Sequence, residues 1–146
     1  MSTSQVFNNA GIAQMMQAYF NNSFAANKNL TLKLFCNNVT PSDTDTTATY
    51  TEASGSGYAA VTLLNGSWVV SQVGGIEQSA YALQTFTFTG PLTTNPTIYG
   101  YYIIDNAVSP NVITAQLLNA PSTPVNNGDI LKVTPLIQGS HGTPTS

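Results

Sequence analysis

The segment TIYGYYIIDN, residues 97–106, constrains the fold more than any other stretch, because as a strand it is apolar on both faces. Side chains alternate between the two faces of a strand. One face carries Ile98, Gly100, Tyr102 and Ile104, and the other carries Tyr99, Tyr101, Ile103 and Asp105. A strand with two apolar faces is covered on both sides. We therefore expect a protein layer on each side of this segment.

The two faces are assigned to different covers. Gly100 leaves room where an opposing sheet comes close, so its face is assigned to the core between two sheets. The face of Tyr99 and Tyr101 then needs a cover of its own: the N-terminal helix, a long loop or a neighbouring subunit. Tyrosine suits such a place, because its ring buries area while its hydroxyl still reaches a partner. Tyr99, Tyr101 and Ile103 are accordingly predicted interface residues.

Short β segments separated by turns make up the chain from residue 30 onward. Residues 30–36 (LTLKLFC) and 81–90 (YALQTFTFTG) alternate as half-buried strands do. Asn65–Gly66 between two apolar runs predicts a type I′ hairpin, whose second arm is broken at Gly74–Gly75. About seven to eight strands and no later helix predict an all-β fold, an antiparallel β-sandwich or jelly roll over residues 30–138. Residues 139–146 are predicted to form a flexible tail.

An N-terminal arm over residues 1–29 is expected to contain one short amphipathic helix. Its apolar positions have helical spacing; they are Ile12, Met15, Met16, Tyr19 and Phe20. Asn8 or Asn9 can cap the start of the helix, and Asn21–Asn22 can end it. A helix of this length is marginal in water on its own. The stripe must therefore dock, either on its own domain or on a neighbouring subunit, and its five residues join the predicted interface.

Charged residues make up only 6% of the chain, against roughly 25% in typical soluble domains. With three lysines, no arginine and a net charge of −3, the chain lacks the clustered cations that bind phosphates or an anionic membrane surface. It also lacks an apolar run of about 20 residues that could cross a bilayer. We expect no nucleic acid and no membrane as partner. A nearly uncharged surface suits either an ordinary secreted or environmental protein or a subunit packed in a large assembly.

The inventory of reactive side chains predicts no enzyme, cofactor or metal site. His141, the single histidine, lies in the tail, and Cys36 ends an apolar strand face. A zinc site needs several such ligands, and no glycine-rich phosphate loop is present. The six carboxylates show no catalytic pairing; Asp105 and Asp129 occur in turn contexts that an Asx turn explains. The motif SDTDTT, residues 42–47, lacks most ligands of a calcium loop.

The N-terminal sequence MSTSQVFNNAG has neither a basic region nor a continuous apolar region, so no secretory signal is expected. Lone Cys36 excludes an intrachain disulfide. We expect a protein made and kept in a cytoplasm until it is released.

Three phrases of the sequence, LFCNNVTPSDTDT, FTFTG followed by IYGYYIID, and PVNNGDILKVTP, resemble small structural proteins of tailed-bacteriophage virions, in particular capsid decoration (cement) proteins. The resemblance covers roughly residues 30–135. It implies an all-β subunit on the capsid surface of the virion, often a homotrimer, that binds the major capsid protein and reinforces the shell.

Two alternatives remain open beside a decoration subunit. The first is a tail, baseplate or head-fibre subunit of the same kind of particle. The second is a carbohydrate-binding β-sandwich that uses Trp68 and tyrosines as stacking platforms, although Trp68 shares its face with Val70 and is better explained as a core residue.

Overall fold

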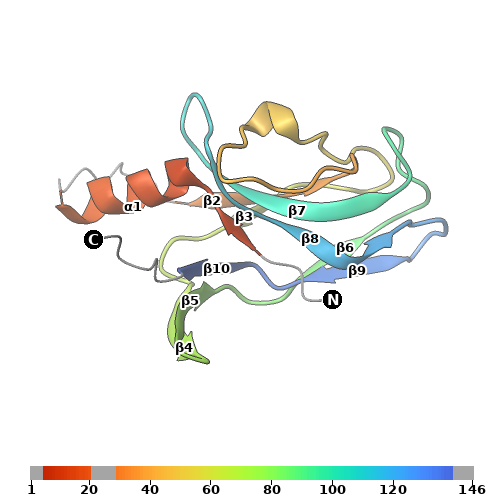
Figure 1. Ribbon diagram of the computed structural model, residues 1–146. Helices are drawn as coiled ribbons and strands as arrows, with labels where there is room; N and C mark the ends of the chain where they lie inside the picture. Colours follow the sequence, from red (N-terminus) through yellow and green to blue (C-terminus); the bar gives the residue numbers. More distant parts are fainter. Residues whose placement is uncertain (1–4, 21–28, 140–146) are drawn as a thin grey trace.

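The computed structural model describes residues 5–20 and 29–139, with side chains described for residues 5–16 and 29–139 (Figure 1). It confirms an all-β, antiparallel sandwich with one short helix near the N-terminus. In chain order the elements are β1 (Val6–Phe7), α1 (Asn9–Phe20), β2 (Leu30–Phe35), the 3₁₀ helix η1 (Thr47–Thr49), β3 (Val61–Leu63), β4 (Val69–Val73), β5 (Ile76–Ala80), β6 (Gln84–Thr87), β7 (Ile98–Asp105), β8 (Val112–Ser122), β9 (Ile130–Val133) and β10 (Leu136–Gly139).

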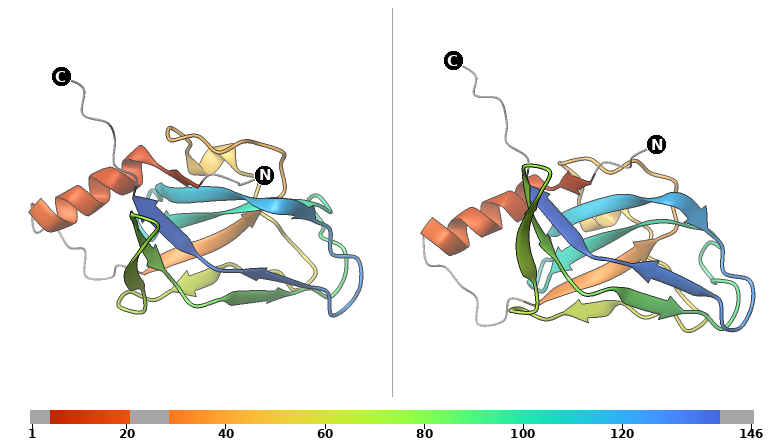
Figure 2. Two further views of the ribbon diagram at one scale, coloured as in Figure 1. Left: turned by 60° about the horizontal axis from the view of Figure 1, so that its bottom comes forward. Right: turned by 90° about the horizontal axis from the view of Figure 1, so that it is seen from below.

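Two layers of strands face each other (Figure 2). The first is a five-stranded sheet in the order β1-β8-β7-β2-β3. The second contains the ladder β10-β5-β4 and the pair β6-β9. The N–H of Tyr81 donates to the carbonyl of Pro135 (2.9 Å) where β5 leads into β6 and β9 leads into β10. These interruptions and the two-residue β1 account for more strands than the seven or eight predicted.

β7 lies between β8 and β2 in the middle of the first sheet and is buried on both faces, as predicted. Tyr101 and Ile103 belong to the core between the layers, together with Leu32, Phe86 and other apolar side chains. Tyr102 and Ile104 belong to a separate cluster on the opposite face. The predicted core position is correct for Ile98, but the assignment of the two faces is wrong from Gly100 onward, after a register shift between Ile98 and Gly100. Alternation could not decide it, because both faces are apolar.

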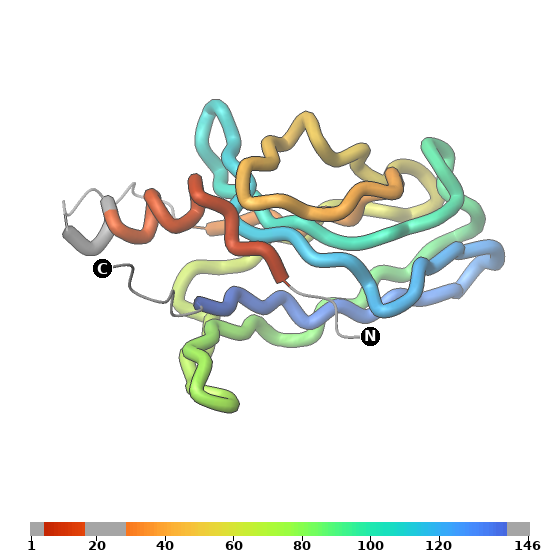
Figure 3. The backbone as a smooth tube through the Cα atoms, viewed as in Figure 1, coloured from red at the N-terminus to blue at the C-terminus, as the bar shows by residue number. Residues whose placement is uncertain are grey.

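The outer face of β7 is covered by a loop of the same chain. Residues 37–50, which include η1, arch over the first sheet (Figure 3). Tyr50, at the end of this loop, stacks on Tyr102 with ring centroids 4.8 Å apart and lies 4.9 Å from the ring of Phe35. The Asn37 side chain fixes the base of the loop, because its Nδ2 donates to the Thr49 carbonyl and its Oδ1 accepts from the Thr51 N–H, both at 2.8 Å. Of the three predicted covers, the long loop is the one present.

The predicted turn at Asn65–Gly66 is present, but the segments that flank it do not pair with each other. β3 pairs with β2 in the first layer, and β4 pairs with β5 in the second. The turn therefore carries the chain from one layer to the other, and the hairpin predicted there is wrong. The real hairpin joins β4 to β5 through Gly74–Gly75. Their φ angles of 59° and 79° fit a two-residue type I′ turn.

α1 is attached to the sandwich by its first turns. Asn8 caps the helix as predicted, since its Oδ1 accepts from the Ala10 N–H (2.9 Å). A Cβ on Gly11 would lie 2.7 Å from the carbonyl oxygen of Ile113, so the absence of a side chain lets α1 approach β8 closely. The Gln14 amide donates to the carboxylate of Asp105 at the end of β7. The rest of α1 extends past the edge of the sandwich (Figure 1).

Candidate interaction surface

One end of the sandwich carries two projecting elements, α1 and the β4–β5 hairpin (Figures 1 and 2). Large apolar side chains are exposed on and beside both elements; they are Ile12, Met15, Met16, Leu64, Val69, Val70, Val73 and Ile76. Their exposed fractions run from 39% for Ile12 to 72% for Val70. Gathered apolar exposure of this kind is typical of association surfaces. We call these eight residues the apolar end.

Hardly any charge accompanies the apolar end. α1 and β4 contain no charged residue, and β5 contains only Glu77. The Glu77 carboxylate accepts a hydrogen bond from the Gln72 amide (3.0 Å). A partner docking here therefore has little charge to desolvate, which is the most costly part of burying a polar surface.

A groove of about 350 Å³ separates α1 from the hairpin. Its apolar lining includes Met15, Leu30, Trp68, Ile113 and Ile137. Trp68 is half-buried and meets Tyr81 edge to face, with ring centroids 5.2 Å apart. Both rings pack against the core between the layers. This placement agrees with Trp68 as a core residue at the groove's margin.

The predicted interface residues of β7 are distributed differently from the expectation. Ile103 is fully buried between the layers, and Tyr101 is 4% exposed. The Tyr101 hydroxyl donates to Gln116 (2.8 Å), and burial raises the pKa of Tyr101 to about 12. Within this fold neither residue can reach a partner, so both are corrected to core residues. Tyr99 is half-buried beside the outer cluster.

Three of the five predicted interface residues of the helix lie on the apolar end. Ile12, Met15 and Met16 are exposed, so this part of the stripe is not docked on the described part of its own domain. The side chains of Tyr19 and Phe20 lie outside the described residues, as do Asn21–Asn22. Whether the exposed stripe meets a neighbouring subunit stays a prediction.

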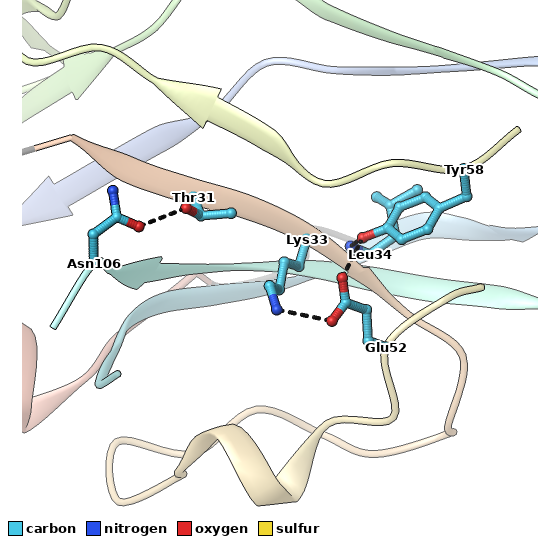
Figure 4. Close-up of polar contacts among 6 residues, drawn as sticks. All are labelled: Thr31, Lys33, Leu34, Glu52, Tyr58 and Asn106. Carbon is cyan, nitrogen blue, oxygen red and sulfur yellow. Dashed lines mark hydrogen bonds and ion pairs between the residues drawn. The ribbon is translucent and has the colours of Figure 1, made fainter. Parts of the chain in front are cut away.

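Carboxylates inside the fold tie loops to strands. Glu52 pairs with Lys33 of β2 (2.8 Å) and accepts from the Tyr58 hydroxyl (3.2 Å), which itself accepts the Leu34 N–H (3.1 Å) (Figure 4). Beside this cluster, the Thr31 hydroxyl donates to the side chain of Asn106 (2.8 Å). These contacts hold two loops against β2 and leave Glu52 engaged with two partners.

Asp105 makes the predicted Asx turn, because its Oδ1 accepts the N–H of Ala107 two residues further on. Asp129 also holds a turn, but it bonds to N–H groups earlier in the chain, so the Asx turn predicted for it is wrong. Burial alone would raise the pKa of Asp105, but hydrogen bonds from Gln14, Asn111 and the Ala107 N–H hold it below its ordinary value. Asp129 accepts the N–H groups of Val125 and Asn126, which lowers the pKa of its carboxyl.

Two further groups bear on chemistry. Cys36 is fully buried, and burial raises the pKa of its thiol, as expected for a small core residue. In the part of the chain that the structure describes, no three His, Cys, Asp or Glu side chains come together as a metal site requires. His141 lies outside that part.

Sequence reasoning missed the hairpin's share of the apolar end, which comprises Val69, Val70, Val73 and Ile76. The run VVSQVGGI does contain a signal, because a Gly-Gly pair between β-branched residues favours a two-residue hairpin. Reading Gly74–Gly75 as a hairpin turn would have placed the valines on a short outer strand.

Comparison of the chain with protein-family models, with curated proteins and with solved structures finds no match. Over residues 5–20 and 29–139, no helix has both the length and the apolar character needed to cross a membrane.

Proposed function

We propose that this protein is a non-enzymatic structural subunit of a tailed-phage virion, a decoration or cement subunit that binds the major capsid protein lattice and stabilises the shell. The observation that carries the proposal is the apolar end. Two projecting elements present seven exposed apolar side chains with almost no charge, and Leu64 lies beside them. Such a surface binds by area and shape, as structural subunits do.

The resemblance of residues 30–135 to capsid decoration proteins is the reason for proposing a phage virion as the assembly. The carboxylates described above add support, because Glu52, Asp105 and Asp129 are engaged in ion pairs or in hydrogen bonds that hold turns. A reaction site would instead need polar groups that converge on a cavity. The groove at the apolar end is lined mainly by apolar side chains.

Quantitative mass spectrometry of purified virions tests the proposal. We expect the protein in intact particles at a copy number comparable to that of the major capsid protein. Presence at a far lower copy number would move the protein to the tail, baseplate or head fibre. Absence from particles would overturn the proposal altogether.

A further inference from the structure

β4 is an open edge of the second layer. It is the outer strand of the ladder β10-β5-β4, and all five of its residues are exposed. Val73 and Ile76 flank the two-residue turn and pair with each other. In an antiparallel ladder, hydrogen-bonded and non-hydrogen-bonded pairs alternate from such a turn. Val69, Ser71 and Val73 therefore direct their backbone groups toward β5, whereas Val70 and Gln72 direct theirs outward, where no described strand pairs with them.

The other edges of the five-stranded sheet and of the β10-β5-β4 ladder are short or covered. β1 has two residues and β3 has three. β10 is approached by Gln5, whose Oε1 accepts the N–H of Gln138 (3.0 Å). β4 has neither a lysine, nor a proline, nor a bulge, which are the usual devices that keep an edge strand from pairing with another chain.

The absence of charge on β4 favours a second copy of this chain as its partner. In a two-fold contact a side chain near the axis lies close to its own copy, so a charge there would meet the same charge. Val69–Val73 carry none, and the nearest acid, Glu77, lies on β5 and is held by Gln72. The edge is therefore compatible with itself electrostatically. All five residues of the strand are apolar or neutral, so pairing between two copies meets no like-charge repulsion along β4.

We propose that β4 pairs antiparallel with β4 of a second copy of this chain, about a two-fold axis that passes beside Ser71. This inference rests on the proposed function for the kind of assembly, and it names a two-fold contact between copies where the resemblance implies a homotrimer. The register places Val70 opposite Gln72 of the copy, so that the outward backbone groups of both strands bond to each other. It also places Val69 opposite Val73 of the copy and each Ser71 opposite the other.

This pairing joins the two β10-β5-β4 ladders into one continuous sheet. A two-stranded ribbon alone is marginal in water, whereas a sheet of several strands with apolar faces is stable. Val69 and Val73 supply cross-strand contacts on one face, and Val70 supplies them on the other. The strand exposed on both faces and along its edge thereby becomes an interior strand.

Disulfide trapping tests the register. The two Ser71 residues form a non-hydrogen-bonded pair, whose Cα atoms lie about 4.5 Å apart, within the range that a disulfide spans. Ser71→Cys should therefore cross-link to a dimer under mild oxidation, with Cys36 silent because it is fully buried. Thr62→Cys, at an exposed position on edge strand β3, is the matched control and should cross-link at least tenfold more slowly. Equal rates for the two variants would contradict the register.

Sedimentation of the purified full chain tests the contact itself. We expect a dimer that Val70→Pro converts to a monomer, because proline removes an outward N–H that β5 does not use. Ser71→Lys should have the same effect by placing two lysines opposite each other, and circular dichroism should show both variants folded. A wild-type monomer, a trimer, or a dimer that survives both substitutions overturns β4 pairing. A monomer that is still present in virions would overturn the pairing alone and leave the proposed function standing.

Discussion

Gly100 marks the closest approach of β7 to its surroundings. A Cβ built on this residue would overlap the carbonyl oxygen of Gln116 and the ring of Phe35. The space that it leaves lies on the side of Phe35 and the outer cluster, so the glycine serves packing within the first sheet and under the loop of residues 37–50.

Substituting Gly100 by alanine should destabilise the fold by about 1–3 kcal/mol, the usual cost of overpacking. Gly139→Ala is the matched control, because a Cβ there meets nothing within 4 Å. Urea unfolding of the two variants measures the difference. Equal midpoints would show that the close approach at Gly100 relaxes freely.

Asp105 makes stability depend on pH in a predictable direction. Its pKa in the folded chain is lowered from 3.8, so its contribution is fully present above the ordinary pKa and is lost as the pH falls through the lowered value. Asp105→Asn should cost about 1.5–3 kcal/mol near pH 7, the range for hydrogen bonds to a charged group. The difference in unfolding free energy between wild type and this variant should shrink below pH 3.8. A difference that stays constant down to pH 2 would contradict this assignment.

Among the elements, the loop of residues 37–50 replaces a second sheet on the outer face of β7. Tyr50 is its main anchor, 5% exposed and packed between Phe35 and Tyr102. Its hydroxyl donates to Asp45 within the same loop (2.6 Å). Through Tyr50, the loop therefore contributes to the apolar cluster on the outer face of the first sheet.

Tyr50→Ala should destabilise the protein by about 3–5 kcal/mol, as for other buried aromatic residues. Tyr50→Phe keeps the ring and removes only the hydrogen bond to Asp45, so it should cost about 1.5–3 kcal/mol. Thermal or urea unfolding separates the two effects. If both variants lost the same stability, the ring would contribute nothing beyond its hydroxyl.

Local patterns in the sequence predicted elements better than they predicted pairings. Alternation over residues 30–36 correctly predicted a strand whose Leu32 and Leu34 lie in the core, and the capping role of Asn8 was also correct. The strand was expected to be half-buried, but Phe35 on its opposite face is fully buried in the outer cluster. The partner of β4 was missed, because Asn65–Gly66 and Gly74–Gly75 are both good turn sequences. Only non-local packing decides which of them closes a hairpin.

The sequence predicted only part of the candidate surface, because local patterns do not show what a segment packs against. Helical periodicity identified Ile12, Met15 and Met16, but a stripe of this kind looks the same whether it is docked or exposed. Tyr101 and Ile103 were misplaced because a strand that is apolar on both faces gives no indication of which face meets the second layer. Such a strand indicates burial, and the chain itself supplies both covers.

Over the residues that the structure describes, the molecule combines a buried sandwich core with an open, nearly uncharged apolar end. Removing residues 1–22 would be a poor test of that end. The deletion would also remove β1, an edge strand that pairs with β8 in the first sheet, and the buried residue Asn8. Substitutions at exposed positions of α1 avoid this problem. Met15 and Met16 are each more than half exposed.

Met15→Ser with Met16→Ser should leave the free energy of unfolding within about 0.5 kcal/mol of wild type, as exposed substitutions usually do. Urea unfolding of the double variant checks this expectation. A large loss of stability would mean that the two methionines pack within the subunit and are not available to a partner.

The incorporation of this double variant into virions is the most direct measurement of the apolar end as an assembly surface. Particles produced with wild type, with Met15→Ser/Met16→Ser, or with the control Val125→Ser, which alters an exposed residue in the loop between β8 and β9, are purified and quantified by mass spectrometry. We predict that the double variant is depleted at least several-fold while the control is retained at the wild-type copy number. Equal copy numbers for all three chains would contradict the assignment of this surface to assembly.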